Sequence, residues 1–198
     1  MDILVRPESA SLVVKGSRFL AELLPCTCQN EARSLIKAQK TKYRDATHVI
    51  HAFVLGKCAE VTGMSDDGEP SGTAGRPVLD VLSGRCCTNV LLTVTRWFGG
   101  TLLGTGGLVK AYGDAAKLVI AEAGRHSAFE ELTEKRFFSF CAEYTLYERI
   151  KRKMVSYHTF NVTEQFGGNV TVRGELRADE YDLFALMIKD LSSGKIQI

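Results

Sequence analysis

Several features that define common protein classes are missing from this sequence. No apolar run approaches the roughly 18 residues that span a lipid bilayer, and the opening MDILVRPESA lacks the apolar core of a secretory signal. The six cysteines contain no C-x-x-C pair, and adjacent or i,i+2 thiols are poorly spaced for tetrahedral zinc. We therefore expect a cytoplasmic protein with free thiols, no structural metal and no membrane partner.

The sequence also has no large excess of positive or negative charge. The 198 residues carry 25 Lys and Arg against 23 Asp and Glu, a formal net charge of +2. Residues 1–128 hold 15 basic and 12 acidic residues, and residues 129–198 hold 10 and 11. Neither part is a polycation, so any nucleic-acid surface must be a local cluster. The composition, 45% hydrophobic and 24% charged, is that of an ordinary globular protein with one or two domains.

In the first part of the chain the hydrophobic pattern alternates between strand and helix signals. Residues 90–98 (VLLTVTRWF) are the clearest strand. Residues 108–123 form a helix that is apolar around most of its circumference, so it should lie in the middle of its domain. The other predicted elements are strands at 11–14, 19–24 and 47–55, helices at 30–42 and 77–82, a long loop at 62–76 and a glycine turn at 99–107.

A second series of strand and helix signals follows a charged linker at about 125–134. It predicts a strand at 138–144, a helix at 147–157, strands at 161–166 and 170–176, a helix at 179–191 and a last strand at 195–198. The order βαββαβ is the ferredoxin-like arrangement. We therefore predict an α+β protein with two domains, residues 1–128 and residues 129–198.

One segment rich in functional groups is SDDGEPSGTAGRP, residues 65–77. Three carboxylates, those of Asp66, Asp67 and Glu69, lie within four residues of each other. They can hold a hard cation, although the spacing does not fit an EF-hand. They can equally accept hydrogen bonds from amides of the loop, or pair with Arg76 and Arg96.

The second such segment is RWFGGTLLGTGGLVKAYGDA, residues 96–115. Its glycines allow positive φ and close approach to another group; they are Gly99, Gly100, Gly104, Gly106 and Gly107. Thr105 can cap the helix that follows, and Arg96 and Lys110 flank the helix end, which together would suit an anion such as phosphate. The segment matches neither the P-loop nor the G-x-G-x-x-G pattern. Tight packing of strand against helix requires the same glycines, so both interpretations stay open.

Together these two segments resemble the signature of the IMPACT/YigZ family. Two shorter elements agree: Lys15-Gly16-Ser17-Arg18-Phe19 is similar to the family's K-x-S-R-F, and Ala46-Thr47-His48 matches its A-x-H. Relatives often continue with His or Asn and then Cys, where this chain has Val49 and Ile50. We therefore expect no catalytic residue here.

The resemblance implies a fold and a function. The first domain is expected to share the fold of GHMP kinases and of a small-subunit ribosomal protein, and the second to be ferredoxin-like, similar to a late domain of the translocating elongation factor. Eukaryotic relatives are implied to regulate translation by competing for the activator of a stress-responsive kinase, with an additional amino-terminal domain that is not seen here. The resemblance thus favours a non-enzymatic, translation-associated protein that contacts ribosome, RNA or a regulatory protein. The alternative is an enzyme or binder of a small molecule or phosphate ligand, using loop 99–107. No cofactor is expected, and the oligomeric state is left open.

We expect the functional surface where residues 65–72 and 96–107 come together around the amino end of the 108–123 helix. The predicted ligand-binding residues are Asp66, Asp67, Glu69, Arg76, Arg96, Gly99, Gly100, Gly104, Thr105, Gly106, Gly107 and Lys110. His48 and His51 are expected to be structural histidines on opposite faces of their strand.

Overall fold

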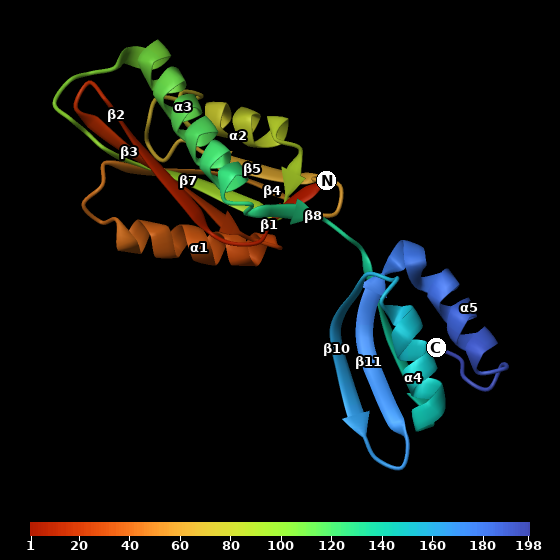
Figure 1. Cartoon of the computed structure of the whole chain (residues 1–198). Helices are drawn as coiled ribbons and strands as arrows, with labels where there is room; N and C mark the ends of the chain where they lie inside the picture. Colours follow the sequence, from red (N-terminus) through yellow and green to blue (C-terminus); the bar gives the residue numbers. More distant parts are fainter. The chain divides into compact units, whose positions relative to one another are not determined.

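The computed structural model describes all residues, Met1–Ile198, as a mixed α+β chain (Figure 1). The chain divides into two compact units, unit 1 (Met1–Leu132) and unit 2 (Thr133–Ile198). Unit 1 extends beyond residue 128 because β8 (Phe129–Glu131) pairs with β1 (Asp2–Leu4). None of the helices combines the length and hydrophobicity needed to cross a lipid bilayer.

Unit 1 is built on a five-stranded antiparallel sheet of order β2-β3-β7-β4-β5. Its strands are β2 (Glu8–Val14), β3 (Ser17–Pro25), β7 (Val90–Trp97), β4 (His48–Leu55) and β5 (Val61–Ser65). The β2-β3 hairpin turns at Lys15 and Gly16, which both have positive φ. A small second sheet joins β6 (Cys87–Thr88) to β1 and β8.

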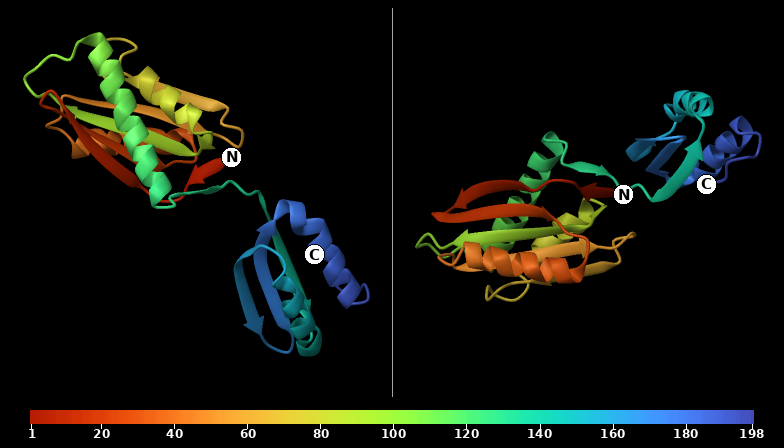
Figure 2. Two further views of the ribbon diagram at one scale, coloured as in Figure 1. Left: turned by 45° about the horizontal axis from the view of Figure 1, so that its top comes forward. Right: turned by 90° about the horizontal axis from the view of Figure 1, so that it is seen from below.

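Helices cover both faces of the large sheet (Figure 2). α2 (Gly75–Gly84) and α3 (Gly104–Arg125) pack on one face, and α1 (Gln29–Lys42) lies on the other. Strand β7 lies in the middle of the sheet and is buried from Val90 to Arg96, which explains why it reads as a nearly continuous apolar run. The helix predicted at 108–123 is confirmed as α3, with buried positions along most of its length. It does not lie in the middle of the domain, because it covers one face of the sheet and leaves Val109, Lys110 and Lys117 exposed.

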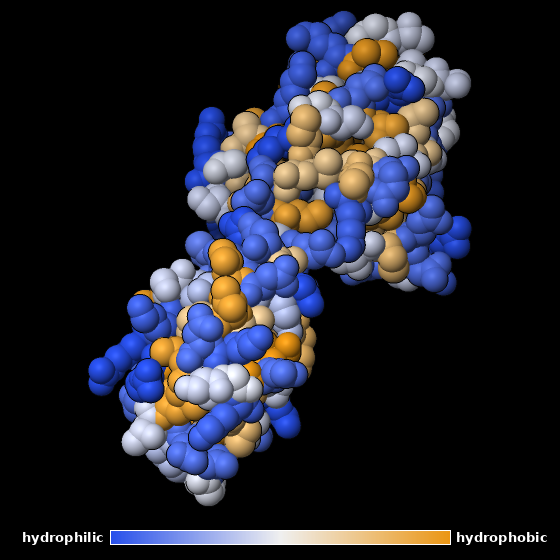
Figure 3. Space-filling view, turned by 90° about the vertical axis from the view of Figure 1, so that its right-hand side faces the viewer, coloured by the Kyte–Doolittle hydropathy of each residue, from blue (hydrophilic) through white to orange (hydrophobic).

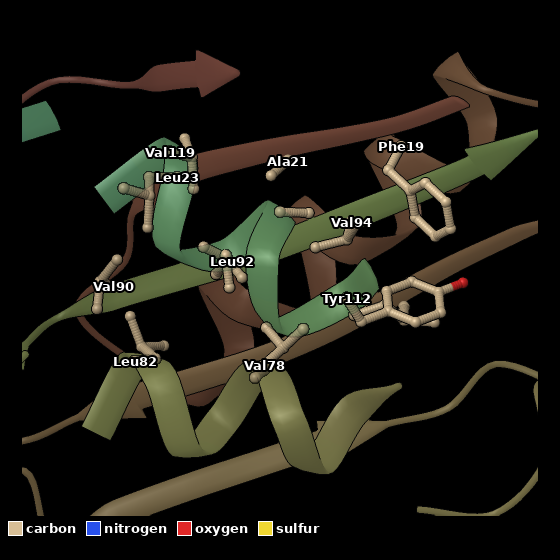
Figure 4. Close-up of a cluster of buried hydrophobic side chains, with 14 of the residues drawn as sticks. Phe19, Ala21, Leu23, Val78, Leu82, Val90, Leu92, Val94, Tyr112 and Val119 are labelled. Carbon is tan, nitrogen blue, oxygen red and sulfur yellow. The ribbon is translucent and has the colours of Figure 1, made fainter. Parts of the chain in front are cut away.

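The main core fills the space between the sheet and the helices α2 and α3 (Figure 4). It includes side chains from three strands and both helices: Phe19, Leu23, Ile50, Val78, Leu82, Leu92, Val94, Tyr112 and Val119. Phe19 meets Tyr112 edge to face, with 5.1 Å between ring centres. A smaller cluster under α1 contains Ala32, Leu55 and Leu91.

Unit 2 has the order β9 (Lys135–Ala142), α4 (Tyr144–Met154), β10 (Thr159–Phe166), β11 (Val170–Arg177) and α5 (Tyr181–Leu191), with a short 3₁₀ turn at Ala178–Glu180. Its antiparallel sheet has the order β10-β11-β9. Alternate residues of β9 and β11 form one core with both helices, including Phe138, Val172, Ile150 and Phe184. Large apolar side chains also reach the surface of each unit among polar ones (Figure 3).

Four sequence-based predictions of local structure are wrong. Residues 62–65, expected in the loop 62–76, belong to β5, because they form hydrogen bonds with β4, a partner that local sequence does not indicate. Residues 129–131, expected in a linker, form β8 for the same reason. Helix α3 begins at residue 104 rather than 108, because Gly106 and Gly107 lie in its first turn, while Gly104 at its start has a positive φ. Residues 195–198 are not a strand, and Ile196 and Ile198 instead pack against the core of unit 2.

Candidate functional site

The two glycine-containing segments meet at a hollow of about 530 Å³ beside the amino end of α3. We call this the α3 hollow. The loop after β5 forms one side, the turn after β7 forms the other, and the start of β4 completes it. The lining residues are Thr47, His48, Gly68, Glu69, Pro70, Arg96, Phe98, Leu102, Leu103, Gly104, Thr105 and Leu108.

A buried ion pair lies at the floor of the α3 hollow. Arg96 Nη1 donates to Glu69 Oε1 at 2.6 Å, and the two residues are only 5% and 7% exposed. Tyr112 donates its hydroxyl to the same oxygen at 2.7 Å. Burial raises the pKa of Tyr112, and its hydrogen bond to Glu69 raises it further, so the hydroxyl stays protonated and remains a donor. Of the partners expected for Arg96, the structure therefore selects Glu69, which balances the guanidinium charge; Nη2 reaches Ser17 Oγ at 3.5 Å and the buried Nε has no hydrogen-bond partner.

His48 lies on the same strand face as the ion pair, since it stands opposite Arg96 across β4 and β7. Its Nδ1 is 2.8 Å from the backbone oxygen of Asp67. A carbonyl oxygen only accepts, so Nδ1 must carry the proton of that hydrogen bond. The other ring nitrogen, Nε2, faces Glu69 Oε2 at 3.9 Å, which is too long for a hydrogen bond. Two hydrogen-bonding atoms thus face each other across a gap at the edge of the hollow.

Asp66 holds the start of α2. Its carboxylate accepts hydrogen bonds from the backbone N–H groups of Gly72, Ala74 and Gly75, at 2.9, 3.0 and 2.7 Å. Burial alone would raise the pKa of Asp66, but these three donors lower it below its ordinary value. The carboxylate caps helix N–H groups that would otherwise lack partners.

Asp67 ties the acidic loop to the sheet and to α1. One carboxylate oxygen contacts Lys40 Nζ, and the other accepts the N–H of Val49 at 2.7 Å. The residue has a positive φ of 45°, a conformation that Asp tolerates better than most residues. All three carboxylates of the loop are therefore engaged by protein donors, and no cluster of three or more metal-ligating side chains exists in the structure.

The glycine turn packs against the β2-β3 hairpin. A Cβ on Gly99 would lie 1.8 Å from the carbonyl carbon of Gly16, so only glycine fits. The N–H of Gly99 donates to Ser17 Oγ, 82 residues away in sequence, at 3.1 Å. Gly100 and Gly104 have φ of 84° and 72°, which glycine adopts readily. The Lys-Gly-Ser element and the glycine turn are thus one packed unit.

Comparison with known proteins gives the family of the chain. The Impact N-terminal domain matches residues 15–120. The IMPACT family member YvyE of Bacillus subtilis is 32% identical over 187 residues, which cover 94% of this chain and 84% of YvyE. The Escherichia coli member YigZ is 34% identical over 185 residues, covering 92% and 81%. A crystal structure described as that of a hypothetical protein superposes with a TM-score of 0.65 at 29% identity, covering 99% of this chain and 94% of that chain.

The chain belongs to the IMPACT family. Every residue that lines the α3 hollow lies within the matched segment, residues 15–120. The hollow of this chain is therefore formed by the segment that matches the Impact N-terminal domain.

Four of the twelve predicted site residues line the hollow, namely Glu69, Arg96, Gly104 and Thr105, and the other eight do not. Arg76 pairs with Asp80 at 2.8 Å on the exposed surface of α2, and Lys110 pairs with Asp114 at 3.2 Å on the exposed surface of α3. Both side chains are exposed: Arg76 lies in the first turn of α2 but on its outer face, and Lys110 lies beyond the first turn of α3. Thr105 is not the helix cap: Leu103 occupies the N-cap position, with no side-chain capping bond. Gly106 and Gly107 belong to the first turn of α3 rather than to the lining of the hollow.

The sequence did not reveal several residues that build the site. Tyr112 reads as a core aromatic of the helix, and only the fold brings its hydroxyl to Glu69. Phe98 and Leu102 read as parts of a strand end and a turn, yet they are 47% and 82% exposed at the hollow. The pairing of His48 with Arg96 could have been found, since both lie on the inward-facing parity of their strands.

Proposed function

We propose that this chain is a translation-associated regulator that acts by binding a partner rather than by catalysis. Its membership of the IMPACT family supports the link to translation, because the resemblance implies that role for eukaryotic members. The proposed partner is the ribosome, RNA or a translation-regulatory protein. The proposed binding surface is the α3 hollow, built from predicted site residues that include Glu69, Arg96, Gly104 and Thr105.

The observation that carries this proposal is that the α3 hollow has exposed apolar side chains at its rim, whereas the charged residues at its base, Arg96 and Glu69, are already paired with each other. Phe98 and Leu102 expose large apolar side chains at the hollow. Exposed apolar side chains gathered around a recess and rimmed by polar residues are typical of protein contact sites and of ligand-binding grooves. The ion pair of Arg96 and Glu69 neutralises itself, so the floor offers little free charge for holding a phosphate.

The test is capture of partners from cell extract by the full chain, with and without ribonuclease. The double variant Phe98→Ala, Leu102→Asp should lose ribosomal or regulatory partners that the unchanged chain retains. The control Val155→Asp changes an equally exposed apolar residue of unit 2, which is 85% exposed, and should retain them. Retention of the same partners by the double variant would contradict the assignment of the hollow.

A second candidate function is binding of a small ligand in the same hollow. It is favoured by the gap of 3.9 Å between His48 Nε2 and Glu69 Oε2, because one hydrogen-bond donor can reach both atoms at about 2.9 Å. Titration of ¹⁵N-labelled protein with ethanolamine and, separately, with inorganic phosphate distinguishes the ligand classes. Saturable shifts of the Gly68 and Thr105 amides with ethanolamine alone support a donor ligand, whereas shifts with phosphate alone favour an anion at the helix end.

We also propose the finer assignments of fold and location. The first domain is proposed to be of the ribosomal-protein and GHMP-kinase type, and the second ferredoxin-like. The βαββα order and the sheet order β10-β11-β9 support the latter, with the fourth strand not formed. All six cysteines are free thiols, which suits the reducing cytoplasm.

A further inference from the structure

A second hollow of about 590 Å³ lies on the opposite face of the sheet, between α1 and β4. We call it the α1 groove. Its lining includes four cationic side chains and two rings: Arg33, Lys37, Lys40, Arg44, His51 and Phe53. Only Lys40 among these contacts a loop that also borders the α3 hollow, through Asp67. The two hollows share no lining residue.

The cations are arranged in a line. Arg33, Lys37 and Lys40 recur at spacings of four and three residues, which places them on one face of α1. Arg44 continues the line just beyond the end of the helix at Lys42. With a rise of about 1.5 Å per residue, successive cations are about 5 to 6 Å apart along the axis. The result is a row of positive charge along the groove rather than a single cluster.

The charge of this row is largely uncompensated. Lys40 pairs with Asp67, but Arg33, Lys37 and Arg44 form no ion pair. The acidic groups near the ends of α1 form hydrogen bonds with neutral donors rather than ion pairs with the row. Glu31 accepts hydrogen bonds from Thr27, and Asp45 accepts the indole N–H of Trp97. Lys42, which does not line the groove, is paired with Glu22. Three exposed cations thus line the α1 groove without an ion-pair partner, while Glu31 and Asp45 keep their negative charges at the two ends of the row; the excess of positive charge favours an anionic partner.

Two flat rings form the wall of the groove on the β4 side. Phe53 and His51 come from the outward-facing parity of β4 and are partly exposed. Gly63 of β5 stands opposite Phe53 and leaves room for its ring, since a Cβ there would lie 2.2 Å from the ring. Burial lowers the pKa of His51, and the charge of Lys40 lowers it further, so the imidazole is neutral at pH 7. Uncharged rings beside a row of cations suit the stacking of nucleic-acid bases.

We propose that the α1 groove binds single-stranded RNA, with Arg33, Lys37 and Arg44 on its phosphates and a base stacked on Phe53 and His51. A row of cations with an aromatic wall matches the backbone and the bases of a single strand. A poly-glutamate peptide would satisfy the cations but would leave the rings without a partner. This inference rests on the proposed translation-associated function and names RNA as a partner, but at a surface distinct from the α3 hollow.

The test is fluorescence anisotropy of the full chain with labelled oligouridylate of about 12 nucleotides, within the usual range of single-strand site sizes. Binding constants are measured between about 50 and 200 mM salt. Three phosphate contacts should give a slope of log Kobs against log[salt] of about −2, at about −0.7 per contact. Lys37→Gln should reduce the magnitude of that slope by about 0.7, and Phe53→Leu should weaken binding about tenfold with the slope unchanged.

The matched control removes the same charge from another helix. The triple variant Arg33→Gln, Lys37→Gln, Arg44→Gln should abolish binding. The triple variant Arg149→Gln, Arg152→Gln, Lys153→Gln, on exposed positions of α4, should leave binding unchanged. Circular dichroism melting verifies that each variant is folded.

Three outcomes would overturn the proposal. They are absence of binding at low salt, equal loss in both triple variants, and equal competition by poly-glutamate of matched length. The proposed function can fail separately. If Phe98→Ala, Leu102→Asp retains every captured partner while oligouridylate binds with the expected slope, the assignment of the α3 hollow is wrong and the RNA groove stands.

Discussion

The buried pair of Arg96 and Glu69 makes a sharp prediction about stability. Replacing Arg96 with Met keeps most of the side-chain volume but leaves the carboxylate of Glu69 buried with only the hydroxyl of Tyr112 as donor. Removing one partner of a buried ion pair typically costs about 3–5 kcal/mol. We therefore expect Arg96→Met to lower the free energy of unfolding of unit 1 by that amount.

Urea unfolding followed by tryptophan fluorescence measures this loss. Trp97 is the only tryptophan and lies in unit 1, so the signal does not report on unit 2. The control Arg76→Met removes an exposed arginine that pairs with Asp80 on α2. Since exposed pairs contribute about 0–1 kcal/mol, it should change little.

The double variant Arg96→Met, Glu69→Gln tests whether the loss of unfolding free energy in Arg96→Met comes from the uncompensated charge of Glu69. It removes both charges, while the amide oxygen that replaces the carboxylate can still accept the hydroxyl of Tyr112. We expect the two changes to couple, so that the double variant is about 1–3 kcal/mol more stable than the sum of the single effects predicts. A loss below about 1 kcal/mol for Arg96→Met, or strict additivity in the double variant, would refute the argument that this pair holds the floor of the hollow.

Three further predictions concern the same region. Gly99→Ala should destabilise unit 1 by about 3 kcal/mol in urea unfolding, because its Cβ would overlap backbone, whereas Gly84→Ala, which meets nothing within 4 Å, should be neutral or slightly stabilising. Tyr112→Phe should cost about 1.5–3 kcal/mol, the usual contribution of a hydrogen bond to a charged group; an unchanged urea midpoint would show that Glu69 does not need this donor. Asp66 has a pKa lowered in the folded state, so its contribution is complete above the unfolded value of 3.8 and is lost as pH falls through the folded value. Asp66→Asn should therefore destabilise at pH 7 and flatten the acid dependence of the melting temperature; a parallel curve would contradict this.

Local patterns in the sequence were sufficient for the elements that are decided by burial alone. The run from Val90 to Val94 is largely apolar because β7 lies between helices on both faces of the sheet. Helix α3 is apolar over most of its surface because it packs against both the sheet and α2. In unit 2, alternation at Phe138, Phe140 and Ala142 marks the inward face of β9. In each case the spacing of the apolar residues along the sequence follows from which face of the strand or helix packs against the core.

Sequence motifs were enough to show which groups meet, but not how they pair. The family motifs predicted that the acidic loop and the glycine turn adjoin, as they do in the α3 hollow. It is the fold that pairs Arg96 with Glu69, while Asp66 caps α2 and Asp67 binds the N–H of Val49. Strands β5 and β8 formed, and residues 195–198 did not, because a strand exists only where a partner offers hydrogen bonds. Neighbouring carboxylates are chemically alike along the chain, and the fold distinguishes them by placing a different donor beside each one.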